Sequence, residues 1–186
     1  MRMFDSSLIT YAVSLHFSQK VNEVVISTLQ TIADKTGNSF MIENKIPPHI
    51  TIGAFHAARE EEVKLLQLVE EFAQGQKAGS VQFSKVGDFN GKVLFLQPEK
   101  NNFLSEINKK LHTLLLPEFE KAENGYYLPD IWFPHTTLAT RLNQSQFSAA
   151  KEIVKKISLP LEAAIEELAV YQCSPFLELK KIELSR

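Results

Sequence analysis

The chain has 186 residues, of which 44% are hydrophobic and 23% are charged, a composition that is typical of a globular protein with a buried core and excludes global disorder. Its net charge of −2 and isoelectric point of about 6.2 argue against a protein built to bind DNA or another long nucleic acid, because such proteins usually present a basic face. The single cysteine, Cys173, excludes an intramolecular disulfide.

No apolar run is long enough to predict a transmembrane helix, which needs about 18 or more consecutive apolar residues. The apolar segment 8–17 is interrupted by polar residues and lacks the small-residue cleavage site of a signal peptide. We therefore expect a cytoplasmic protein without membrane contact, and a monomer as its default state.

Apolar periodicity in the first half predicts strands that alternate with helices. Ser18 is a plausible N-cap of the first helix, and Gly37 is a plausible C-terminal stop. A lead-in over 42–48 precedes the second strand. The expected elements are a strand over 8–17, a helix over 18–35, a strand over 48–55 and a helix over 60–74.

The second half is expected to begin with a hairpin, because Asn90-Gly91 separates two runs of alternating apolar residues. The hairpin strands span 81–89 and 92–97. The remaining elements are a helix over 102–116, a loop over 117–130, a strand over 131–141, a helix over 144–157, and strands over 166–173 and 176–184 that meet near Ser174-Pro175.

A short motif occurs twice, once in each half. Pro48-His49-Ile50-Thr51 is repeated as Pro134-His135-Thr136-Thr137, each in a strand-like apolar run. Because side chains two apart on a strand share a face, His49 and Thr51 are expected to point the same way, as are His135 and Thr137. One His-x-Thr tripeptide carries little information, but two copies preceded by proline indicate a paired site.

The order of strands and helices around the two motifs is similar, and no flexible linker separates them. The sequence therefore predicts an internal duplication: one folding unit over residues 1–186, made of two lobes related by a pseudo-two-fold axis. Lobes that face each other would bring both motifs into one central groove.

Two matched imidazole and hydroxyl pairs suit the cleavage of a phosphodiester. An unperturbed histidine titrates at about pH 6.5, so one imidazole can take a proton from water while the other gives a proton to the leaving oxygen. The hydroxyls of Thr51 and Thr137 can bind the phosphate oxygens. This chemistry requires no metal or other cofactor, and no zinc-binding or nucleotide-binding motif is present.

Other residues near the motifs carry weaker hypotheses. Arg141 lies at an even offset from His135, so a regular strand would turn it toward a phosphate, although it also suits the surface end of a strand. By the same parity Gly53 and Phe55 would share the His49 face, where Phe55 could stack on a base or pack against a helix.

Aromatic residues also lie close to the second motif. Tyr126, Tyr127 and Trp132 could stack on a nucleobase or anchor the loop that contains them.

The remaining histidines are expected to be structural. His16 ends the first strand and would at most line the groove, His56 is out of phase with His49, and His112 lies in the third helix. Cys173 is expected to be a buried bystander.

Taken together, these residues resemble the 2H phosphoesterase superfamily, which is named for two His-x-Thr/Ser motifs, and within it the bacterial 2'-5' RNA ligase-like proteins or cyclic phosphodiesterases. The motif residues His49, Thr51, His135 and Thr137, the flanking prolines and the order of elements carry this resemblance. It implies an α+β fold with an antiparallel-rich sheet in each lobe, helices outside, and the histidines facing each other across a groove.

The resemblance also implies an activity, namely the metal-independent opening of 2',3'-cyclic phosphates. The expected substrate is a small cyclic nucleotide or an RNA terminus, and the absence of a basic cluster beside either motif favours a small one. Two alternatives stay open: 2'-5' RNA ligase-type processing, which is the same chemistry in reverse, and a non-catalytic module that binds a nucleotide or RNA end.

Overall fold

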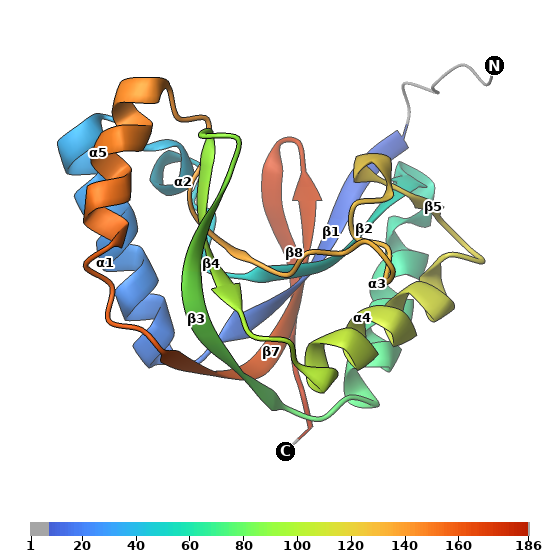
Figure 1. The fold of residues 1–186 in the computed structure, drawn as a ribbon. Coiled ribbons are helices and arrows are strands. Elements are labelled where there is room, and N and C mark those ends of the chain that lie inside the picture. The colour runs from blue at the N-terminus through green and yellow to red at the C-terminus, as the bar shows by residue number, and fades with distance from the viewer. Residues whose placement is uncertain (1–7, 186) are drawn as a thin grey trace.

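A computed structural model describes residues 8–185 of the protein (Figure 1). Strands and helices alternate along the chain, as the sequence predicts. The strands are β1 (Leu8–Phe17), β2 (Ile50–Ala58), β3 (Gly79–Phe89), β4 (Val93–Pro98), β5 (Glu120–Lys121), β6 (Thr136–Ala139), β7 (Leu161–Cys173) and β8 (Phe176–Glu183). The helices are α1 (Gln19–Thr36), α2 (Phe40–Glu43), α3 (Glu62–Gln74), α4 (Asn102–Leu115) and α5 (Gln144–Val154), with short 3-10 turns η1 (Arg59–Glu61) and η2 (Glu123–Gly125).

The strands form a sheet in the order β5-β2-β1-β7-β3-β4-β6, with β8 paired to β7. Every pairing between these named strands is antiparallel. The long strand β7 links the two parts of the sheet. Its first residues pair with β3, and its later residues pair with β1 and β8. The expected α+β class with antiparallel strands is therefore confirmed, although the strands form one continuous sheet and not a separate sheet in each lobe.

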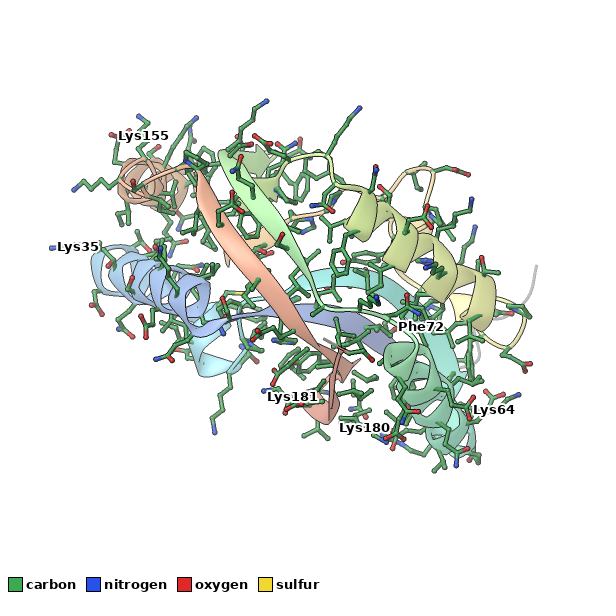
Figure 2. All side chains as sticks on the ribbon, turned by 90° about the horizontal axis from the view of Figure 1, so that it is seen from below. Lys35, Lys64, Phe72, Lys155, Lys180 and Lys181 are labelled. Atoms are coloured by element: carbon green, nitrogen blue, oxygen red, sulfur yellow. The ribbon has the colours of Figure 1, made fainter. Side chains whose placement is uncertain are left out.

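Two pairs of helices flank the strands. Helix α1 packs on α5 at one side and α3 packs on α4 at the other (Figures 1 and 2). Helix α1 belongs to the first half of the sequence but contacts β6, the strand of the second motif. The halves of the sequence therefore do not coincide with the lobes of the fold. None of the helices in the described part of the chain combines the length and apolarity of a membrane span.

Apolar residues at helical and strand spacing form the core between helices and sheet. Helix α1 buries Val21, Val25, Leu29 and Ile32. Its C-cap is Gly37, which has a left-handed φ of 70° that residues with a Cβ adopt less readily. The hairpin turn is also as predicted, since Asn90 and Gly91 both have positive φ, at 50° and 67°.

Strand β7 begins five residues earlier than the predicted strand over 166–173, at Leu161. In the segment that was missed, Leu161, Ala163 and Ile165 are buried and alternate with exposed residues, which is the period-two pattern of a half-buried strand. This segment pairs with β3 and joins the two lobes.

The second motif strand is shorter than the predicted 131–141. Only Thr136–Ala139 pairs with β4, because Pro134 has no N–H to donate to a strand ladder. Arg141 lies beyond the strand with a left-handed φ of 59°.

A β-bulge interrupts the pairing of β1 with the first motif strand. Val13 pairs with Gly53 and Ser14 pairs with Thr51, so Ile52 is an extra residue in β2. The extra residue reverses the side-chain parity beyond it. Gly53 and Phe55 therefore face α4 and not the side of Thr51, and the expectation that they share the His49 face is wrong.

The close packing at this bulge makes Gly53→Ala a test of the core. A Cβ at this position would lie 2.8 Å from the Phe55 ring and 2.9 Å from a methyl group of Leu111. We expect the substitution to lower the free energy of unfolding by about 1–3 kcal/mol, measured by urea denaturation. Gly75→Ala is the control, because its Cβ would meet nothing closer than 3.5 Å. Equal stability of the two variants would contradict the packing described here.

Candidate active site

The two motif histidines occupy equivalent positions in the fold. His49 immediately precedes β2, and His135 immediately precedes β6. Both are half-buried. The motifs thus place each imidazole at the start of its strand, where the backbone is free of ladder hydrogen bonds.

Each imidazole is held by the same hydrogen bond. Nδ1 of His49 lies 2.7 Å from the carbonyl oxygen of Pro47, and Nδ1 of His135 lies 2.8 Å from that of Phe133. A carbonyl oxygen only accepts, so Nδ1 must carry the proton in both rings. Nε2 of each neutral ring therefore keeps its lone pair and is left available for proton transfer.

The second motif acts electrostatically on the first. Burial lowers the pKa of His49, and the nearby His135 lowers it further, while the hydrogen bond to Pro47 opposes the change. Burial likewise lowers the pKa of His135. The two imidazoles therefore interact electrostatically, and protonation of one ring disfavours protonation of the other. Among residues 8–185, no three His, Cys, Asp or Glu side chains converge to hold a metal ion.

The motif threonines lie beside further hydroxyl groups. Oγ1 of Thr51 is 3.3 Å from Oγ of Ser14 on β1. The hydroxyl of Tyr127 interacts with Thr51, while burial raises the pKa of Tyr127 to about 12, so this hydroxyl stays protonated. Thr137 pairs with Phe95 of β4 and is half-buried. Ser14 was not predicted, because only the pairing of β1 with β2 brings it to Thr51.

Phenylalanine rings surround His135. The ring centroids of Phe89 and Phe95 lie 5.1 and 5.3 Å from that of His135, and Phe133 lies at 6.5 Å. Phe95 is buried, whereas Phe89 and Phe133 are 38% and 42% exposed. These aromatic residues were not predicted as part of the site, although Phe89 directly precedes the Asn-Gly turn.

Polar groups lie beside His49 instead. The ring centroids of His16 and Tyr171 are 6.3 and 6.4 Å from that of His49. His16 was expected at most to line the groove, and it is in fact only 4% exposed. His56 was expected to be out of phase, but the bulge turns it to the side of Thr51, where Nδ1 lies 3.2 Å from Oγ1 of Thr10.

Two of the weaker candidates lie elsewhere. The expected orientation of Arg141 is wrong because the strand ends before it, and its guanidinium lies over the Phe40 ring at 3.9 Å. Phe55 is fully buried, with its ring 5.3 Å from that of His112 on α4. Neither side chain therefore adopts the position that strand parity predicted.

The two other aromatic candidates belong to the segment that leads to His135. Nε1 of Trp132 donates to the carbonyl oxygen of Thr51 at 3.1 Å, so Trp132 anchors this segment to the first motif strand. Tyr126 is 65% exposed and makes no such contact with the motif. A stacking role for Tyr126 stays a prediction.

A cavity of about 1010 Å³ adjoins the second motif. It lies between the β3-β4 hairpin, the first half of α4, and the residues Phe133 and Pro134. Three lysines line it, Lys85, Lys100 and Lys109, together with Glu99 and Glu106. In the part of the chain that the structure describes, these three ammonium groups form no ion pair.

Comparison of the sequence with known protein families identifies the class of protein to which this fold and these paired motifs belong. A family profile described as the 2'-5' RNA ligase superfamily matches residues 23–174, which contain both motifs. The chain therefore belongs to this superfamily, that of the 2H phosphoesterases. No curated protein matches the chain.

Solved structures share its fold at low sequence identity. The apo form of E. coli LigT is 15% identical with a TM-score of 0.63, covering 97% of this chain and 100% of LigT. E. coli LigT complexed with 3'-AMP is 12% identical with a TM-score of 0.64, covering 96% and 99%. TT0787 of Thermus thermophilus is 17% identical with a TM-score of 0.59, covering 95% and 98%.

The hydrogen bonds of the two imidazoles predict their protonation in solution. Long-range ¹H–¹⁵N correlation spectra at pH 7 are expected to show the proton on Nδ1 in both His49 and His135, with pKa values below the usual value of about 6.5. With these lowered pKa values, the histidines of the unfolded chain take up protons at a higher pH than those of the folded protein. The free energy of unfolding is therefore unaffected by these residues above about pH 6.5 and decreases as the pH falls below it. Protons on Nε2 would contradict the geometry.

Proposed function

We propose that the protein is a 2H-type phosphoesterase that opens 2',3'-cyclic phosphates by general acid–base catalysis without a metal ion. The observation that carries this proposal is the matched pair of imidazoles, each bound through Nδ1 to a backbone carbonyl and each with Nε2 available. The proposal treats residues 1–186 as one two-lobed catalytic domain that acts as a cytoplasmic monomer.

The proposed reaction is an in-line displacement at phosphorus. One neutral imidazole takes a proton through Nε2 from a water molecule, whose oxygen forms the new bond to phosphorus. The bond from phosphorus to one ribose oxygen breaks, and the other imidazole, protonated at Nε2, gives its proton to that oxygen. An anionic phosphate between the rings favours the protonated acid and so opposes the lowered pKa values of the free protein.

The hydroxyl groups supply the phosphate contacts in this proposal. Thr51 and Thr137 would donate to the non-bridging oxygens, where charge develops in the transition state. Ser14, at 3.3 Å from Thr51, can orient the Thr51 hydroxyl or add a donor. Removal of one such donor commonly costs about 10²–10³-fold in kcat.

Two features support a nucleotide as the substrate. The exposed rings of Phe89 and Phe133 beside His135 offer surfaces on which a nucleobase could stack. E. coli LigT, which shares the fold, has been solved with 3'-AMP. The lysines of the adjoining cavity favour an RNA terminus over a mononucleotide, because they could hold the phosphate that precedes the reacting end. Ligation to a 2'-5' bond would use the same groups in reverse.

The first test is product analysis with nucleoside 2',3'-cyclic monophosphates and a short RNA that ends in a cyclic phosphate, in EDTA. We expect His49→Ala and His135→Ala each to lower kcat by about 10²–10⁴-fold. His56→Ala is the matched control, since it removes an imidazole from β2, the strand that follows His49, but this imidazole lies beside the Thr10 hydroxyl. In the wild type, kcat/KM should follow a bell-shaped pH profile whose optimum is more acidic than that of kcat.

Several outcomes would contradict this proposal. Activity that survives either alanine substitution would exclude the two-histidine mechanism, and activity lost in EDTA but restored by a metal would exclude the metal-independent form. Binding of these nucleotides without any turnover would instead favour a non-catalytic module. The position of the phosphate in the product gives the regiochemistry of ring opening.

A second test concerns the size of the substrate. The double variant Lys85→Ala, Lys109→Ala is expected to lower kcat/KM several-fold on the short RNA and to weaken its salt dependence, while cyclic mononucleotides react as before. The control removes two lysines of the α5 region, Lys151 and Lys155. An equal effect of both double variants, or an equal loss on mononucleotides, would argue against the cavity as an RNA site.

A further inference from the structure

Three polar side chains, two of them buried, form a hydrogen-bonded chain beside His49. His16 on β1, Tyr171 on β7 and Glu178 on β8 form it. The Tyr171 hydroxyl is 2.9 Å from Nε2 of His16 and 3.1 Å from Oε2 of Glu178. His16 and Tyr171 are only 4% and 2% exposed, so the proposed reaction does not use them directly.

The direction of these hydrogen bonds follows from their chemistry. An ionised carboxylate only accepts, so the single hydroxyl proton of Tyr171 goes to Glu178. Nε2 of His16 must then carry a proton and donate it to the tyrosine oxygen. Desolvation lowers the pKa of His16 to about 3, with contributions from His49 and Lys181, so His16 is a neutral imidazole with a fixed tautomer.

The charged groups around the chain are few. Lys181 lies 3.4 Å from Glu178, and Glu167 also faces Tyr171 and raises its pKa together with burial and Glu178. Lys180, the neighbour of Lys181, instead forms an ion pair with Glu70 of α3. Figure 2 shows Lys180 beside this helix. The ring of Phe176 stacks on Tyr171 at 4.8 Å. The Tyr171 hydroxyl thus has one defined donor, His16, and one defined acceptor, Glu178, whose side chain is 44% exposed.

Two rings of this hydrogen-bonded chain, those of His16 and Tyr171, are neighbours of the His49 ring. The centroids of His16 and Tyr171 lie 6.3 and 6.4 Å from that of His49 and 5.7 Å from each other, so the three rings form a compact triangle. The hydrogen bond from Nδ1 of His49 to the carbonyl oxygen of Pro47 holds one edge of the ring, and His16 and Tyr171 are its ring neighbours. No comparable polar chain contacts His135, whose ring neighbours among the described residues are phenylalanines.

We propose that His16 and Tyr171, anchored by Glu178, are positioning residues that fix the orientation of the His49 ring and contribute to its proton affinity. This inference rests on the proposed function, because it concerns the same acid–base pair. It makes the two histidines unequal although their motifs are alike: a hydrogen-bonded polar network supports one ring, and a hydrocarbon surface supports the other.

The test compares Tyr171→Phe with Tyr11→Phe in the full-length protein. Tyr11 is a matched control because it is fully buried on the same sheet and donates to a carboxylate, Glu62 at 2.9 Å, but faces the helices. We expect Tyr171→Phe to lower kcat on a cyclic phosphate by about 10-fold or more with little change in KM. NMR titration should show a larger change in the pKa of His49 than in that of His135, because only the His49 ring adjoins Tyr171.

His16 provides a second pair of variants. In His16→Gln the amide nitrogen can replace Nε2 as the donor to Tyr171, whereas His16→Met keeps a side chain of similar size without a donor. We expect the glutamine variant to retain most of kcat and the methionine variant to lose it as Tyr171→Phe does. Equal losses in both would show that the hydrogen bond is not what positions His49.

The outcomes separate this inference from the proposed function. If Tyr171→Phe alters kcat and the His49 titration no more than Tyr11→Phe does, the hydrogen bonds of Tyr171 have only a structural role. The inference is then wrong, and the proposed function is unaffected. If wild type turns over no cyclic phosphate, the proposed function fails, and the NMR titration of His49 in the same variants still decides whether His16 and Tyr171 contribute to its proton affinity.

Discussion

The long strand β7 is the constraint on which the arrangement of the site depends. Its first residues pair with β3 and its later residues with β1 and β8, so one strand fixes the two lobes relative to each other. The first motif is attached to β7 through β1, and the second through β3 and β4. Because register fixes which side chains share a face of the sheet, the pairing of these strands determines where the two imidazoles lie relative to each other.

The local geometry of the motifs is repeated, but their surroundings are not. Each histidine precedes its strand and donates from Nδ1 to the carbonyl two residues before it, which follows from a short local segment that both motifs share. The neighbours come from unrelated parts of the chain: buried His16 and Tyr171 beside His49, and phenylalanines beside His135. A duplicated motif can therefore place two imidazoles of the same local geometry in different surroundings.

Predictions that depended on local pattern succeeded. The end of the first helix at Gly37 and the Asn90-Gly91 turn both follow from short stretches of sequence. Predictions from strand parity failed for Phe55 and Arg141, because a bulge at Ile52 and the early end of β6 each change the direction of later side chains. A bulge leaves no reliable trace in the pattern when consecutive residues after it are apolar and buried, as Ala54 and Phe55 are in β2.

The sequence by itself determined the family, the alternation of strands and helices, and the identity of the two His-x-Thr motifs, because these depend on periodicity and on short motifs. Only the tertiary structure decided which side chains surround each histidine. Ser14, His16 and Tyr171 reach the first motif through strand pairing, and Phe89 and Phe95 reach the second in the same way. Such contacts join residues far apart in the chain, and their register depends on the whole sheet, which no local pattern of residues encodes.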